Sequence, residues 1–299
     1  MRTLLRRSGQ ILGVLAFLLV FAFVAVSWSA KNQLGRNYKV TVAKVAVPSD
    51  AEAIAQGRHL AATRGCYDCH GEDLGGLIVI DDPAMGRVAG PNLTRGPGGL
   101  AARYGDDDYV RAIRHGLAPD GHPLFLMPST DYAPFSDEDL GALIAYLKSV
   151  PPVNRARGPV QLGPIARLLM FVGTIKPSAE LIDHELLRPA KITAGLTVEY
   201  GRYVANACTG CHGPNLSGGR IASGPSDWPR AANLTPDATS RLATWTEADF
   251  LNLLRTGKRP DGTAVSPVMP RAFGELYEVE QKSLWLFLKS LPAAPTGTR

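Results

Sequence analysis

The chain opens with a continuous hydrophobic segment. Residues 11–26 are all apolar or glycine, three arginines precede them, and the segment continues through Ser-Trp-Ser to Ala30. That length approaches the ~17–20 residues that span a bilayer. Arginines before an apolar helix hold its start in the cytoplasm. We therefore predict that residues 1–30 form a signal anchor or transmembrane helix in a bacterial inner membrane. The N-terminus would lie in the cytoplasm and the rest of the chain in the periplasm.

Cleavage of this segment is the alternative, because a secretory signal peptide also has a basic start and an apolar centre. A cut after Ala30 would place the bulky Trp28 at position minus three, where a small residue is preferred. The sequence therefore favours an uncleaved anchor.

Beyond the anchor, the hydrophobic spacing is helical. The sequence SDED at 136–139 resembles a helix cap, and Leu140, Leu143, Ile144 and Leu147 follow at helical spacing. Strand-like alternation is scarce, apart from LIVI at 77–80. The fold class predicted is therefore all-α. Helices are expected before each cysteine pair and at 106–116, 136–149, 246–257 and roughly 275–290.

The same motifs occur twice along the chain, at a nearly constant offset. Cys66 recurs as Cys208, Met127 recurs as Met269, and YLKSVPP at 146–152 recurs as FLKSLPA at 287–293. Landmarks in the same order indicate a tandem duplication. We therefore predict six parts: an anchor (1–30), a stalk (31–49), a first domain (50–152), a linker (153–195), a second domain (196–293) and a C-terminal tail (294–299).

The linker contains two kinds of sequence. Its start, PPVNRARGPVQLGP, is too rich in proline and glycine for regular structure. The apolar run IARLLMFVG at 165–173 is too short to span a membrane. We expect this run to pack between the two domains, and contact with the bilayer or a membrane partner is the alternative.

All four cysteines lie in two Cys-x-x-Cys-His motifs: Cys66, Cys69 and His70, then Cys208, Cys211 and His212. Two thiols one helical turn apart can bond the two vinyl groups of a haem, and the adjacent imidazole then lies beneath the iron. A redox dithiol would need a βαβ setting that the pattern lacks, and a four-cysteine zinc site would leave both histidines over. The motifs therefore predict two covalently bound haem c groups.

The second axial ligand of each iron decides whether a substrate can reach it. In the first half the candidates are His59, His115, His122 and Met127. Only Met127 keeps its residue type at the matching position of the second half, where it is Met269, and a proline follows each methionine. The duplication therefore predicts Met127 and Met269 as ligands, with His70 and His212 on the opposite sides of the irons.

The net charge of +5 comes from the N-terminal segment. Residues 1–49 contain seven basic and no acidic side chains, which leaves −2 for residues 50–299. The charge is thus no sign of nucleic-acid binding. Within the remainder, residues 50–150 carry −7 and residues 151–299 carry +5, which gives the two halves different faces for partner proteins.

Each half resembles a class I cytochrome c domain, and the whole chain is similar to membrane-anchored di-haem cytochromes c, including cytochrome subunits of periplasmic alcohol and sugar-acid dehydrogenases. The dehydrogenase subunits carry three haems, whereas this chain has two motifs. The resemblance implies that the carbonyl of Pro91, or of Ala232 in the second half, orients the proximal histidine. It also implies that Gly57 and Gly201 admit an aromatic ring where the first and last helices cross.

These features predict an electron-transfer protein rather than an enzyme. Two haems, each held by His and Met, would pass single electrons from a dehydrogenase or quinol-oxidising complex to a terminal oxidase or soluble carrier. The alternative is a di-haem peroxidase-like or thiosulfate-oxidising enzyme with one open iron. A third possibility is an obligate subunit of a larger oxidoreductase complex.

Overall fold

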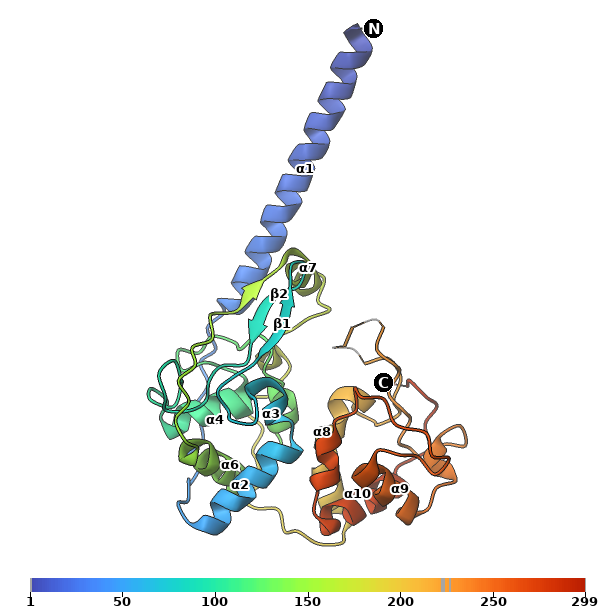
Figure 1. The fold of residues 1–299 in the computed structure, drawn as a ribbon. Helices are drawn as coiled ribbons and strands as arrows, with labels where there is room; N and C mark the ends of the chain where they lie inside the picture. Colours follow the sequence, from blue (N-terminus) through green and yellow to red (C-terminus); the bar gives the residue numbers. More distant parts are fainter. Residues whose placement is uncertain (1, 222–223, 226, 299) are drawn as a thin grey trace.

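The computed structural model describes residues 2–221, 224–225 and 227–298. The first residue of the predicted anchor and the last residue of the predicted tail lie outside the described residues. The chain is mostly helical. Figure 1 shows two smaller helical bodies that lie side by side, with one long helix extending from the first of them.

The long helix is α1 (Arg2–Leu34), and its large apolar side chains between residues 11 and 24 are exposed. Its stretch Arg6–Leu34 is long and apolar enough to cross a membrane. The helix continues to Leu34, beyond the predicted end of the anchor at residue 30. After Leu34 the predicted stalk continues as extended chain against the first half, where Val42, Val45 and Val47 pack on the core.

The apolar run of the linker forms α7 (Pro164–Phe171), which packs against the end of α1. The guanidinium of Arg167 donates to the Ser27 hydroxyl over 3.3 Å, and the Gln33 side-chain amide donates to the Met170 carbonyl over 3.4 Å. The expectation that this run packs between the domains was therefore wrong. Ala166 and Met170 are the buried residues of α7, and the helix that packs on α7 is α1.

The first half contains five helices among its described residues: α2 (Ala51–Thr63), α3 (Cys66–His70), α4 (Asp106–His115), α5 (Ser129–Tyr132) and α6 (Asp137–Ser149). The Ser136 hydroxyl accepts from the Asp139 amide, which caps α6 as the SDED sequence predicts. Helix α4 ends at Gly116 with φ of 67°, a left-handed conformation that glycine adopts without strain.

The second half repeats this arrangement with α8 (Val198–His212), α9 (Glu247–Thr256) and α10 (Glu278–Ser290), and with short 3₁₀ turns η2 (Arg241–Ala243) and η3 (Arg271–Glu275). A third such turn, η1 (Ser178–Glu180), lies in the linker. In each half the first helix packs against the last one, α2 on α6 and α8 on α10. The helices predicted at 106–116, 136–149, 246–257 and 275–290 are therefore confirmed, with small differences at their ends.

Glycine permits both crossings. A Cβ atom on Gly57 would lie 2.0 Å from the Ala142 carbonyl oxygen and 2.7 Å from the Tyr146 Cβ. A Cβ atom on Gly201 would lie 1.9 Å from the Ser283 carbonyl oxygen and 2.8 Å from the Phe287 Cβ. The expected close approach of glycine and aromatic residue is therefore present in both halves.

The all-α prediction needs one correction, because the first half carries a small antiparallel sheet of order β1-β2-β3. Strand β1 (Ile78–Asp82) begins in the LIVI sequence and pairs with β2 (Gly86–Ala89), whose Gly86 and Arg87 pair with β3 (Gln161–Leu162). Strand β3 lies in the linker segment that was expected to be irregular. Its pairing is long-range, so the local proline and glycine content did not reveal it.

Candidate functional site

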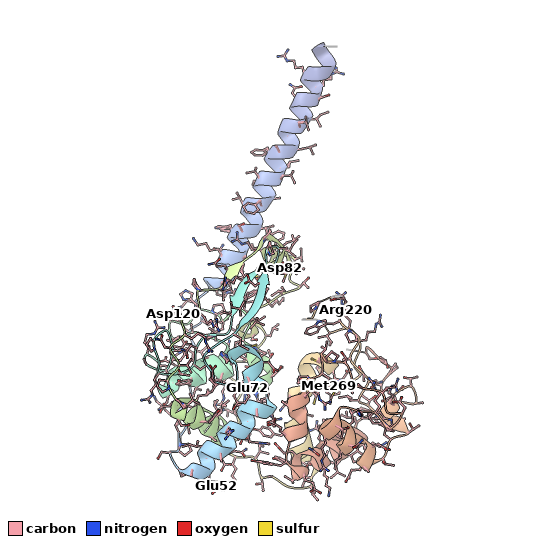
Figure 2. The ribbon with its side chains drawn as sticks, in the orientation of Figure 1. Glu52, Glu72, Asp82, Asp120, Arg220 and Met269 are labelled. Atoms are coloured by element: carbon pink, nitrogen blue, oxygen red, sulfur yellow. The ribbon has the colours of Figure 1, made fainter. Side chains whose placement is uncertain are left out.

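A cavity lies beside the Cys-x-x-Cys-His motif of each half. The first cavity, of about 190 Å³, is lined by Cys66, Cys69, His70 and Met127 together with apolar side chains. The second, of about 240 Å³, is lined by Cys208, Cys211, His212 and Met269. Figure 2 labels Met269 within the second half. The structure thus brings all eight predicted site residues together in two sets of four, one set per cavity.

Each histidine is oriented by a backbone carbonyl. The His70 Nδ1 lies 2.9 Å from the Pro91 carbonyl oxygen, and the His212 Nδ1 lies 2.7 Å from the Ala232 carbonyl oxygen. An Nδ1–H that donates to a carbonyl leaves Nε2 without a proton and able to bind a metal. Because the contact uses only the backbone, alanine in the second half replaces the proline of the first without loss.

Burial favours the neutral form of both imidazoles. Desolvation lowers the pKa of His70 and of His212, and the hydrogen bond to the carbonyl opposes this effect in each case. A neutral imidazole is the form that coordinates metal.

The cysteines do not have the character of a redox dithiol. Burial raises the pKa of the Cys66 thiol to about 12 and that of Cys208 to about 11, and it also raises the pKa of Cys69 and Cys211. Reactive dithiols have lowered pKa values. The two pairs also line different cavities, which excludes a shared four-cysteine zinc site.

The histidines that compete with methionine as ligands have partners elsewhere. The His115 Nδ1 lies 3.0 Å from the His184 Nδ1. The His122 Nδ1 lies 3.0 Å from the Asp120 carboxylate, which Figure 2 places at the outer edge of the first half. The His59 Nε2 lies 2.7 Å from the Glu280 carboxylate. These three side chains are absent from the lining of both cavities, whereas Met127 and Met269 contribute to it.

The cavities fit a large, mostly apolar group that carries acidic substituents, as haem does. Each contains one buried polar atom that has no hydrogen-bond partner among the described residues: the Tyr109 hydroxyl in the first and Nη1 of Arg64 in the second. Burial raises the pKa of Tyr109 to about 12, so its hydroxyl stays a donor. Buried donors without partners are rare, and a carboxylate of the bound group would satisfy them.

Sequence reasoning missed the role of two asparagines, one in the loop behind the motif histidine of each half. The Asn92 amide nitrogen donates to the carbonyls of Val153 and Arg155 over 2.8 and 3.0 Å. The Asn233 amide nitrogen donates to the Ala294 carbonyl over 2.7 Å. Both ties bind the chain after the last helix to the loop behind the histidine. The sequence NLT occurs at 92–94 and again at 233–235, and this repetition was a signal for the role.

Comparison with known proteins agrees with this geometry. Residues 52–147 match the family model described as cytochrome c oxidase, cbb3-type, subunit III. The chain is 31% identical to the gluconate 2-dehydrogenase cytochrome c subunit of Pantoea cypripedii, over 77% of this chain and 55% of that protein. It is 27% identical to the fructose dehydrogenase cytochrome subunit of Gluconobacter japonicus, over 81% of this chain and 53% of that protein.

A third relative is matched over most of its length. The chain is 26% identical to the diheme cytochrome c-type protein of Cereibacter sphaeroides, over 83% of this chain and 91% of that protein. By contrast, the chain spans about half the length of the two dehydrogenase subunits. Residues 52–147 therefore carry a cytochrome c family domain, and the relatives of the chain are cytochrome c subunits of dehydrogenases and a diheme cytochrome c.

Proposed function

We propose that this protein is a membrane-anchored di-haem cytochrome c that carries single electrons in the periplasm. The family supports covalently bound haem c and electron transfer. The observation that carries the finer proposal is the repeated cavity, with a carbonyl-bonded histidine and a methionine in the lining of each. The proposed boundaries are 50–152 and 196–293 for the two class I cytochrome c domains.

In this proposal the chain supplies attachment, orientation and closure of each haem. Cys66 and Cys69 would bond the first haem and His70 and Met127 would hold its iron. Cys208, Cys211, His212 and Met269 would do the same for the second. A haem so bound supplies reversible one-electron chemistry, and the protein sets its potential and its contacts. With a histidine and a methionine holding each iron, a substrate would have no direct access to it.

The proposed electron donor is a dehydrogenase or a quinol-oxidising complex, and the acceptor is a terminal oxidase or a soluble carrier. The dehydrogenase relatives support a donor of the first kind. Helix α1 would hold the protein in the inner membrane with its arginines on the cytoplasmic side. The acidic first half and basic second half would then meet different partners.

The test is a count of haems and of methionine ligands. Intact mass and a haem assay on the purified protein should give two haems per chain. Met127→Ala and Met269→Ala should each remove half of the far-red methionine–iron charge-transfer band. Met85→Ala is the matched control, because Met85 lies outside both cavity linings, and it should keep the full band. A single haem, or a band that survives both ligand variants, would overturn the proposal.

A further inference from the structure

The two halves meet through two equivalent contacts in which the roles of the halves are exchanged. The Tyr203 hydroxyl donates to the Asp139 carboxylate over 2.6 Å, and the His59 Nε2 lies 2.7 Å from the Glu280 carboxylate. Tyr203 follows Gly201 by two positions and His59 follows Gly57 by two, while Asp139 and Glu280 each stand third in the last helix of their half. Helix α5 also packs on α8, and η3 packs on α2. The interface is therefore pseudo-symmetric.

One side chain at this interface, that of Arg64, has no counterpart at the matching position of the second half. Cys66 follows the crossing Gly57 by nine positions, whereas Cys208 follows the crossing Gly201 by only seven. The first half therefore has two extra positions between glycine and cysteine. Helix α8 runs without a break into its motif, but α2 ends at Thr63, and Arg64 and the left-handed Gly65 separate it from α3. Arg64 is part of this insertion.

Arg64 crosses from the first half into the second. Its side chain is only 4% exposed, and it lines the second cavity, not the first. Its Nη2 lies 3.8 Å from the Glu280 carboxylate, whereas its Nη1 has no hydrogen-bond partner among the described residues. Glu280 is absent from the lining of the second cavity, so the Arg64 guanidinium lies nearer to that cavity than the Glu280 carboxylate does.

The two cavities differ in charge as a result. The lining of the first contains no lysine, arginine, aspartate or glutamate among the described residues, whereas four arginines line the second: Arg64, Arg230, Arg241 and Arg259. Of these only Arg64 is buried, and water and salt screen exposed charges far more strongly than buried ones. A Cβ on Gly210 would lie 2.9 Å from the Asp131 carboxylate, so this acid also approaches the second motif, although it is absent from the cavity lining.

We propose that the buried charge of Arg64 raises the reduction potential of the haem in the second cavity. A residue of the first half would thus tune the haem of the second. This inference rests on the proposed function. A fixed positive charge stabilises the reduced iron, which carries one positive charge fewer than the oxidised iron. Guanidinium stays protonated at all physiological pH values, so the effect is permanent. When one electron passes from the first haem to the second, the first iron is oxidised and the second reduced, and Arg64 favours that direction.

The test is a potentiometric titration of the full-length protein that resolves both haems. Arg64→Gln should lower the potential of the second haem so that its ferric-to-ferrous ratio at a fixed potential rises at least tenfold, which is about 59 mV for one electron. Arg64→Lys keeps the charge and should restore most of the potential. Glu280→Gln removes the opposing charge, keeps an oxygen that can accept the helix-capping bond from Tyr277, and should raise the potential instead.

The second haem is identified by repeating the titrations in a Met269→His background, since replacing a methionine ligand by histidine lowers the potential of that haem. Equal shifts in Arg64→Gln and Arg64→Lys, or a fall in Glu280→Gln, would overturn the inference, because packing and not charge would be responsible. If Arg64→Gln does not fold, Glu280→Gln still decides, because a charge effect predicts a raised potential in that variant while Arg64→Lys stays near the wild-type value. A chain that binds one haem would refute the proposed function; two haems with no Arg64 effect would refute only this inference.

Discussion

The crossing of α2 and α6 makes Gly57 sensitive to a single methyl group. In Gly57→Ala the new Cβ would lie 2.0 Å from the Ala142 carbonyl oxygen, and ordinary contact begins near 3.4 Å. The helices would therefore have to separate by more than an ångström. Helix α6 supplies Leu143 and Leu147 to the wall of the first cavity, so its position is tied to the site.

The expected cost follows from two opposing effects. Overpacking costs about 1–3 kcal/mol, and a clash with a backbone carbonyl falls at the upper end because no side-chain rotation relieves it. Alanine is preferred to glycine within a helix by about 1 kcal/mol. We therefore expect Gly57→Ala to lower the free energy of unfolding by about 2 kcal/mol, and Gly201→Ala to behave in the same way in the second half.

Urea unfolding of the full chain in detergent, followed by circular dichroism and haem absorbance, measures this change. Gly158→Ala is the matched control, because a Cβ on Gly158 would meet no atom within 4 Å. It should change stability by less than about 0.5 kcal/mol. If Gly57→Ala unfolds at the same urea concentration as Gly158→Ala, the close crossing is not what the structure describes.

Three further predictions concern the loop behind His70, the pH dependence of stability, and the interface between the two halves. Asn92→Ala should cost about 2–4 kcal/mol in a thermal unfolding measurement, because two carbonyls lose their donor; an unchanged midpoint would contradict this role. Burial and the neighbouring His184 lower the pKa of His115 to about 4. The stability that neutral His115 contributes to the folded state is therefore complete above about pH 6.5 and is lost as pH falls toward 4. His115→Gln should remove most of that pH dependence in an unfolding series from pH 7 to pH 4, and a parallel pH profile would refute it. Tyr203→Phe should cost about 1–2 kcal/mol in urea unfolding by removing the bond to Asp139, and no loss would show that this contact is idle.

The helices and the two site groupings could be predicted from the sequence, because their causes are local or repeated. The cap before Leu140 and the glycine after His115 mark helix ends within a short stretch of the chain. The spacing of Cys66, Cys69 and His70 fixes their geometry within one turn. The methionines could be selected only because the chain contains each site twice.

The remaining features depend on long-range contacts. Strand β3 forms because Gln161 meets Arg87, which comes far earlier in the chain, and no short window contains both. Helix α7 lies against α1 rather than between the halves because Gln33 and Ser27 provide partners there. The hydrophobic pattern of the linker shows that a face is buried but not which element covers it.

The interface was hidden from the sequence for a related reason. Asp139 and Glu280 look like ordinary first-turn acids, which are favourable at any helix start. Their second use, across the interface with Tyr203 and His59, appears only when the halves are placed together. Arg64 was visible as an extra residue only once the offsets of glycine and cysteine were compared.

The most direct measurement is the optical spectrum of the purified full-length protein, oxidised and reduced, combined with intact mass and exposure of the reduced form to carbon monoxide. Two His/Met haems predict the mass of two attached haems, two equivalents of the far-red methionine–iron band and no carbon monoxide binding. One attached haem, or a high-spin haem that binds carbon monoxide, would contradict the proposed electron carrier and would favour an enzyme with an open iron.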